Sequence, residues 1–187
     1  FTGHLVSMKI PLEVIDDEQQ RAVIQGMGYT EPFEINMTFD GGYQTASDTL
    51  DFRTFVIDTT NVGKITLGGK FAGVPLSKMS DPEKAKEIAA TAKLDNFSIR
   101  FDNAGIVEKV LDLQAKQSGM SKQDFVTQIT GALPFMLNFL GNETFQKKVA
   151  DAATAFLNDP KSITVSVKPG TPTAFVQILG AAQTAPQ

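Results

Sequence analysis

Cysteine and tryptophan are absent from the 187-residue sequence, and histidine occurs once, at His4. The absence of cysteine excludes disulfides, thiolate nucleophiles, cysteine-bound zinc and iron–sulfur clusters. A Ser-His-Asp triad would have to use His4, and the G-x-S-x-G elbow of many hydrolases is also missing. The sequence therefore carries no catalytic motif, and we expect a protein that is not an enzyme and uses no cofactor or metal.

Long apolar runs and an excess of basic charge are missing as well. No uninterrupted apolar stretch approaches the ~20 residues of a membrane-spanning helix. The 17 basic and 21 acidic residues give a net charge of −4, and the basic residues are scattered, which disfavours binding to nucleic acid. The chain opens at Phe1 without the basic and apolar segments of an export signal, as expected if a signal or an anchor has been removed.

Apolar and polar residues alternate with period two in several segments, which predicts β-strands. These segments are His4–Val14, Phe33–Phe39, Leu50–Ile57, Ile65–Phe71, Phe97–Phe101 and Ile163–Val167. Asp40-Gly41-Gly42 and Ser47-Asp48 are expected to mark a long turn in the first hairpin. The apolar phase slips between Phe52 and Phe55, which predicts a β-bulge. Consecutive strands with short turns indicate an antiparallel meander, with Pro11 placing the first strand at an edge.

Capping residues and helical spacing predict the helices, among them one that begins at the Asp81-Pro82 pair. The expected helices are Asp16–Gln25, Asp81–Lys93, Ala104–Ser118, Ser121–Leu133, Asn142–Asn158 and Thr171–Leu179. Pro134 should kink or restart the fourth of them. The apolar segment Phe135–Leu140 that follows should be buried or face something apolar.

The order of these elements predicts an α+β fold: a curved antiparallel sheet, built as a meander, with apolar helices packed on one face. A chain of this length fits one domain, which should bury roughly 70% of the surface of the unfolded chain. We assign residues 1–180 to a single domain and residues 181–187 to a flexible tail.

One apolar constellation stands out among the predicted helices, in a sequence with 14 Phe residues. Two interpretations remain open: these residues close the core over the sheet, or they line a cavity that imperfect packing around a kinked helix leaves for an apolar ligand. Its members, the candidate ligand-binding residues, are Phe125, Ile129, Leu133, Phe135, Met136, Leu137, Phe139, Leu140, Phe145, Val149 and Phe156.

Two stretches resemble known proteins. The run from Phe33 to Val74, with its Gly-Gly pair, Thr49-Leu50-Asp51-Phe52 and the segment from Val62 to Phe71, resembles repeats of bacterial envelope proteins of the AsmA-like kind. Leu94 to Pro169 resembles the end of uncharacterised exported proteins of alphaproteobacteria. The resemblance implies a β-rich, exported protein linked to lipids.

We therefore expect a non-enzymatic periplasmic or envelope-associated domain that binds a lipid or other apolar ligand between its sheet and its helices. The alternative is a structural or protein-interaction module of the cell envelope that binds no ligand. A cytoplasmic location also remains open. An enzyme would need acid–base chemistry from carboxylates that sequence alone cannot place in space, namely Asp48, Asp51, Asp58 and Asp102.

Overall fold

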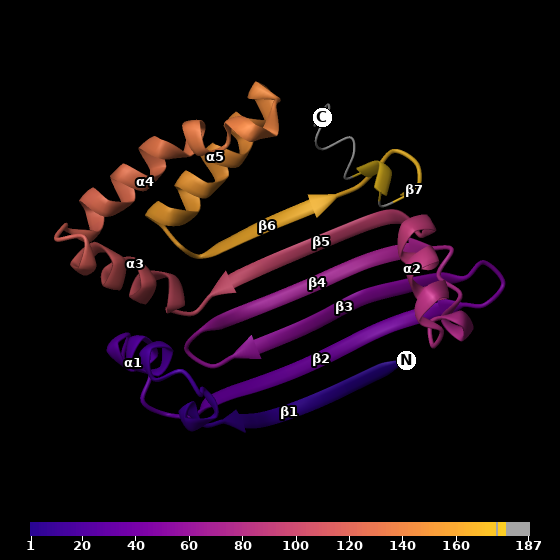
Figure 1. Cartoon of the computed structure of the whole chain (residues 1–187), viewed down its shortest axis with the longest axis horizontal. Coiled ribbons are helices and arrows are strands. Elements are labelled where there is room, and N and C mark those ends of the chain that lie inside the picture. The colour runs from indigo at the N-terminus through magenta and orange to yellow at the C-terminus, as the bar shows by residue number, and fades with distance from the viewer. Residues whose placement is uncertain (175, 179–187) are drawn as a thin grey trace.

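The computed structural model describes residues 1–174 and 176–178 of the chain, and its centre is an open antiparallel sheet (Figure 1). The order of the long strands in the sheet is their order in the sequence, and a short strand, β7, pairs with β5 beside β6. The α+β fold and the meander are confirmed. The strands are β1 (Thr2–Ile10), β2 (Phe33–Gln44), β3 (Thr49–Thr59), β4 (Gly63–Ala72), β5 (Lys93–Asn103), β6 (Ser162–Val167) and β7 (Thr173–Ala174).

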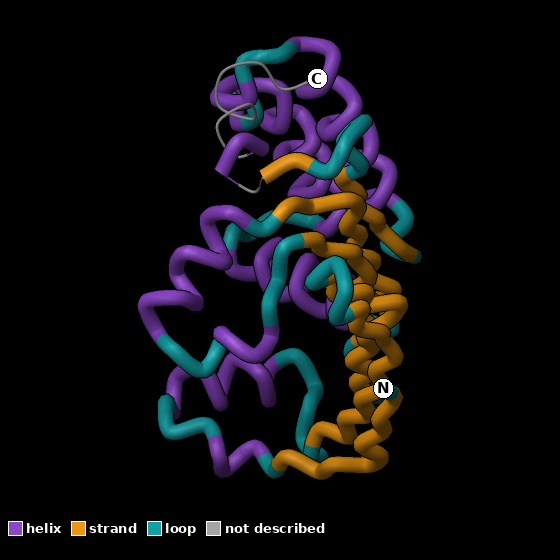
Figure 2. The backbone as a smooth tube through the Cα atoms, turned by 90° about the vertical axis from the view of Figure 1, so that its right-hand side faces the viewer, coloured by secondary structure: helices purple, strands orange, loops and turns teal. Residues whose placement is uncertain are grey.

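Figure 2 shows most of the helical segments on one side of this sheet, and Figure 1 shows α4 and α5 beyond its β6 edge. α2 lies at one end of the strands, whereas α1 and α3 lie at the other end (Figure 1). α4 packs between α3 and α5, and α5 contacts β6. The α-helices are α1 (Glu18–Gly26), α2 (Pro82–Thr91), α3 (Ile106–Gln117), α4 (Lys122–Met136) and α5 (Glu143–Asn158), with short 3-10 turns η1 (Leu12–Val14), η2 (Leu76–Lys78) and η3 (Asn138–Leu140).

Four of the helices begin at capping side chains that the sequence predicts. Asp81, Ser121 and Asn142 each accept a hydrogen bond from a backbone N–H in the first turn that follows. At α3 the Asn103 side chain accepts from the N–H groups of Gly105 and Val107, at 3.2 and 3.1 Å. Since each cap satisfies donors that lack a partner within the helix, the predicted starts of these four helices are confirmed to within two residues.

The long turn predicted for the first hairpin is confirmed at Ser47-Asp48, since the turn falls at residues 45–48, and is wrong at residues 40–42, where β2 continues to Gln44. Gly41 lies in the strand beside a register shift. A Cβ added there would lie 2.8 Å from the Asp51 carbonyl oxygen. The glycine therefore serves a close approach of two backbones within the sheet and not a hairpin turn.

Three further boundaries differ from the prediction. β1 ends at Ile10, since Pro11 has no N–H for the sheet and a 3-10 turn follows. α4 runs through Pro134 as one helix to Met136. The helix predicted over Thr171–Leu179 is wrong at its start, where β7 pairs with the first residues of β5, and is confirmed at residues 176–178, which are helical. Residues 175 and 179–187, including the predicted tail, lie outside the described residues.

Apart from Thr49, the buried side chains come from three parts of the chain, which we call clusters: the two flanks of α1, α2 and its surroundings, and α3–α5 together. No described large side chain is fully withdrawn from solvent. The chain exposes 12093 Å², whereas a compact monomer of 20.2 kDa exposes roughly 8,800 Å². Folding thus buries roughly 59% of the extended-chain surface, less than the roughly 70% expected. The clusters are Leu12 and Tyr29; Val74, Ile88 and Leu94; and Leu111, Ala115, Val126 and Ala150.

Leu94→Ala should lower the free energy of unfolding by about 2–5 kcal/mol, because the side chain is only 2% exposed and its removal leaves a cavity beside α2. Leu5→Ala is the control, since Leu5 is exposed on the edge strand and should cost about 1 kcal/mol or less. Urea unfolding monitored by circular dichroism measures both. If both substitutions lower the free energy of unfolding equally, the cluster at α2 contributes no more to stability than the edge of the sheet does.

Candidate functional site

One face of the sheet is apolar across all six long strands. Residues paired between neighbouring antiparallel strands share a face, so the register aligns their side chains in rows that cross the strands. We call the two longest rows the apolar sheet face. The first contains Leu5, Met37, Ile57, Ile65, Phe101 and Ile163; the second contains Gly3, Phe39, Phe55, Leu67, Ile99 and Val165.

Two β-bulges preserve this face along the strands. The register shifts between Phe52 and Phe55, where the sequence predicted a bulge, so that both rings lie on the apolar side. A second shift lies between Leu5 and Met8. There Ser7 adopts a left-handed φ of 56°, and its N–H donates to the Asn36 side chain at 2.8 Å. Without the extra residues, the apolar positions beyond each bulge would point to the opposite face.

The opposite face of the sheet is polar and charged. Asp58, Lys64 and Asp102 follow one another across β3, β4 and β5. The Arg100 guanidinium donates to the Asp102 carboxylate at 2.9 Å and holds the pKa of that carboxyl below its usual range. Arg53 lowers the pKa of Asp40 in the same way. Such pairs suit a solvated face, so the sheet is amphipathic and its apolar side is the side that carries the helices.

The helices leave the middle of the apolar sheet face open. At one end of the strands the α5 ring of Phe156 meets Phe101 edge-on, with 6.3 Å between the ring centroids. Toward the middle, Phe39 and Ile99 are exposed, and Val165 on β6 is 57% exposed. A row of apolar side chains that would normally be covered is therefore in contact with solvent.

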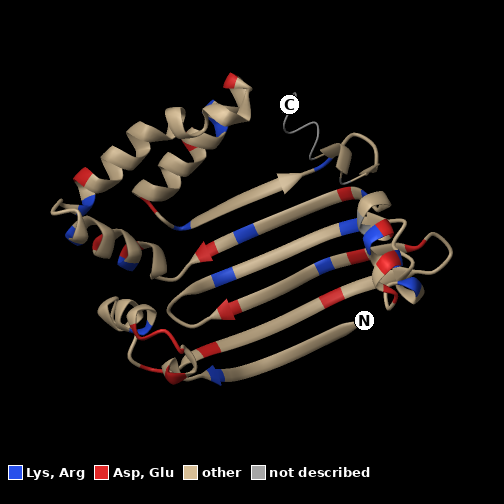
Figure 3. Ribbon diagram, viewed as in Figure 1, with Lys and Arg blue, Asp and Glu red and all other residues tan. Residues whose placement is uncertain are grey.

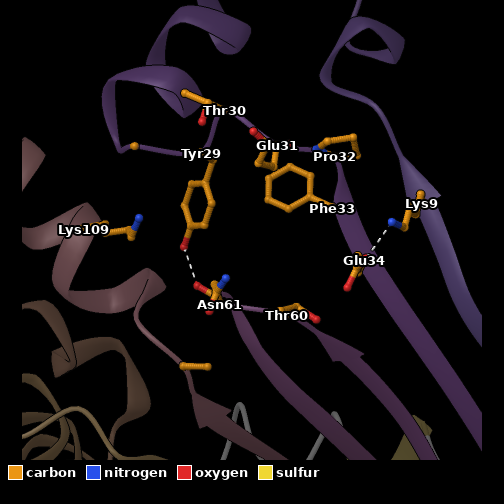
Figure 4. A pocket seen from close by; sticks show the side chains of 12 residues that line it. Lys9, Tyr29, Thr30, Glu31, Pro32, Phe33, Glu34, Thr60, Asn61 and Lys109 are labelled. Atoms are coloured by element: carbon orange, nitrogen blue, oxygen red, sulfur yellow. Dashed lines mark hydrogen bonds and ion pairs between the residues drawn. The ribbon is translucent and has the colours of Figure 1, made fainter.

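A pocket of about 570 Å³ lies at the end of the apolar face, between the loop after α1, the β3–β4 turn and α3 (Figure 4). The Tyr29 hydroxyl donates to the Asn61 carbonyl at 2.9 Å, and the Tyr29 ring packs against Phe33. Lys109 places its ammonium 4.0 Å from the centre of the Tyr29 ring and donates to the Met27 carbonyl at 3.0 Å. These contacts join α1, the sheet and α3.

Lys9 and Glu34 form an ion pair of 3.0 Å on the other wall of this pocket, across from Lys109 (Figure 4). The pocket is therefore lined by charged groups of both signs as well as by aromatic rings. Sequence reasoning missed it, because its residues come from four separate segments and form no motif. The one available signal was Tyr29, a bulky residue between a helix end and a strand.

The eleven candidate residues of the helices divide into an inner and an outer set. Neither the pocket at Tyr29 nor a second one of about 210 Å³ beside α2 is lined by any of them. Phe135, Met136, Phe139 and Phe145 are exposed. The others are half-buried, and among them only Phe156 has a ring contact with the sheet: Phe125, Ile129, Leu133, Leu137, Leu140, Val149 and Phe156.

The carboxylates considered for acid–base chemistry do not form a cluster. Asp48 accepts a hydrogen bond from Tyr43, Asp58 and Asp102 lie on either side of Lys64, and the pKa of Asp102 is lowered, whereas a general acid needs a raised pKa. His4 lies on the polar face of β1. Among residues 1–174 and 176–178, no three metal-ligating side chains are grouped, and no helix is long and apolar enough to cross a bilayer.

The fold and the site define an α+β domain whose antiparallel sheet presents an open apolar face. A family model described as "Uncharacterized protein" matches residues 56–187, more than two thirds of the chain, and the chain belongs to this family. The matched segment runs from the middle of β3 onward and includes α2 to α5. Searches of curated proteins and of solved structures give no match.

Both tyrosines should ionise later in the folded protein than in the unfolded chain. Burial and the nearby Glu108 carboxylate raise the pKa of Tyr29, and the hydrogen bond to Asp48, with burial, raises the pKa of Tyr43. Because the neutral form is favoured by folding, this contribution to stability is full below pH ~10 and is lost as the pH rises through the folded-state pKa values.

Ultraviolet titration of tyrosinate measures this shift without interference, since tryptophan is absent. Tyr43→Phe leaves Tyr29 as the one reporter, and its titration should lie above the titration of the same variant in urea. Coincident curves would show that Tyr29 is not held at the pocket as described.

Proposed function

We propose that this protein is a non-enzymatic domain that binds the acyl chain of a lipid, or a similarly long apolar ligand, across its apolar sheet face. The observation that carries the proposal is the continuous row of apolar side chains on six strands, with Phe39, Ile99 and Val165 exposed to solvent. Exposed apolar surface of this extent marks a binding surface in most soluble proteins.

The length of the row fits an acyl chain. Six strands spaced ~4.8 Å apart give a row of about 24 Å. One leaflet of a bilayer has a hydrocarbon thickness of ~15 Å. A whole acyl chain can therefore lie along the row, where it loses contact with water over its full length.

The composition of the row suits a ligand without polar groups. Its members are aliphatic or aromatic, apart from Gly3, and the backbone groups beneath them are paired within the sheet. Such a surface offers dispersion contacts but no hydrogen-bond donor or acceptor that would fix the identity of the ligand. Selection by chain length and shape is therefore expected, rather than recognition of one headgroup.

A location in the periplasm or cell envelope belongs to the same proposal. It is supported by the resemblance of residues 33–74 to repeats of AsmA-like envelope proteins, which are linked to lipids. Of the eleven helical residues named above, Phe156 would border the binding surface, because its ring contacts Phe101 on the sheet.

The second candidate function is a structural or protein-interaction module, in which another polypeptide covers the same face. It is favoured by the exposure of β6 at the edge of the sheet, where Val165 could meet a partner. The ligand is preferred, because α2 stands at one end of the strands and α1 and α3 stand at the other end (Figure 1). A protein partner has to fit between them, whereas a single acyl chain is narrow.

Val165→Asp should weaken binding of a fluorescent fatty acid at least about tenfold, because the ligand would have to desolvate an unpaired carboxylate. Thr164→Asp is the matched control: Thr164 is also exposed, adjacent in β6, and lies on the polar face. It should bind the probe like the unmodified protein.

The protein is first freed of bound lipid by refolding from denaturant, and both variants are checked by circular dichroism. The ligand proposal fails if the unmodified protein does not bind the probe, or if both substitutions weaken binding equally. A dimer in sedimentation experiments that Val165→Asp alone dissociates would support the interaction module instead.

A further inference from the structure

The hairpin of α4 and α5 ends in an exposed apolar tip. Phe135 is 85% exposed, Phe139 is 78% exposed and Met136 is 60% exposed. We call these three residues the helical tip. Its two Phe rings are more exposed than any other large apolar side chain in the described part of the chain.

The tip is held by ordered contacts. On the inner side, Leu133, Leu137 and Leu140 are half-buried where α4 and η3 pack against α5. The Gln146 side chain on α5 donates to the Leu137 carbonyl at 2.8 Å, and Gly141 turns the chain with a φ of 66°. Phe135 and Phe139 are therefore directed outward by a fixed backbone while the leucines hold the turn in place.

Charge is absent from the three tip residues and from most of α4. No charged residue occurs between Asp124 and Glu143, and α4 has no coloured segment over most of its length in Figure 3. Beyond the tip, α5 carries two adjacent exposed cations, Lys147 and Lys148, of which Lys147 pairs with Asp151 at 2.8 Å. The apolar tip is thus followed first by the exposed carboxylate of Glu143 and then, one to two turns along the helix, by two basic groups.

We infer that the helical tip inserts into the interfacial region of a lipid bilayer. Phe and Met side chains without polar partners suit the boundary between headgroups and acyl chains, and cations nearby are attracted to anionic headgroups. Two Phe and one Met present on the order of 500 Å². This is less than the ~800 Å² that each partner buries in a typical stable protein interface, so a bilayer is favoured over a second protein.

This insertion differs from a membrane span, because no described helix is long and apolar enough to cross a bilayer. It also does not depend on ligand binding by the apolar sheet face, since the tip and Val165 lie on different elements. Membrane docking and acyl-chain binding can therefore be tested separately on the same protein.

A single fluorophore can report the insertion, because the chain has no cysteine of its own. Phe139→Cys carrying an environment-sensitive dye should shift to shorter wavelength when vesicles of phosphatidylcholine and phosphatidylglycerol are added, and less with phosphatidylcholine alone. The same dye on Thr164→Cys, on the polar face of β6, should not shift.

Flotation of the unlabelled protein with the same vesicles tests the contribution of the rings. The double substitution of Phe135 and Phe139 by Ser should reduce the vesicle-bound fraction about tenfold or more. The matched control replaces Val6 and Val14 by Ser, two exposed apolar residues outside the tip, and should float like the unmodified protein.

Val165→Asp should also float normally, which distinguishes a failure of this inference from a failure of the proposed ligand site. The inference is overturned if the dye at position 139 does not respond to vesicles, or if both double substitutions reduce flotation equally. It is also overturned if the protein self-associates without lipid and the tip substitutions abolish that association, since the tip is then a protein interface.

Discussion

The structure depends on one constraint. The apolar face of the sheet is six strands wide, but the helices cover only its two ends. An amphipathic sheet normally buries its apolar side under a second layer. Here Leu94 is buried at one end and Phe101 meets Phe156 at the other, while Ile99 between them is exposed. The buried clusters stay small and separate because no helix crosses the middle, so strand pairing contributes much of the cohesion.

Local features of the fold could be predicted from sequence because each depends on a few neighbouring residues. Asp81 before Pro82 marks a helix start, because its own side chain caps the helix. The apolar residues change from even to odd positions between Phe52 and Phe55, and this change alone marks a bulge. The prediction of a turn at Gly41 was wrong because the deciding contact is not local. A glycine needed for close contact between strands has the same local sequence pattern as a glycine in a turn. The Asp51 carbonyl oxygen, which leaves no room for a side chain at position 41, is ten residues away in the sequence.

The candidate site could be predicted only in part. Alternation indicates which residues share a face, but whether a helix covers that face depends on where α3, α4 and α5 dock, and this is a property of the whole chain. Among the apolar helical residues, the pattern could not tell Leu137, which is half-buried, from Phe139, which faces solvent. The pocket at Tyr29 brings together distant residues, such as Lys9 and Lys109, that no spacing rule connects.

The meander order makes the width of the sheet adjustable in steps. Among the six long strands, each is hydrogen-bonded to the ones before and after it in sequence, and β5 also pairs with the short β7. An inserted or deleted hairpin would therefore lengthen or shorten the apolar rows by about 10 Å, two strand spacings, without rethreading the rest of the fold. Under the proposed function, duplication or loss of a hairpin would match the length of the apolar rows to longer or shorter hydrocarbon chains, while the helices at the ends of the strands keep their places.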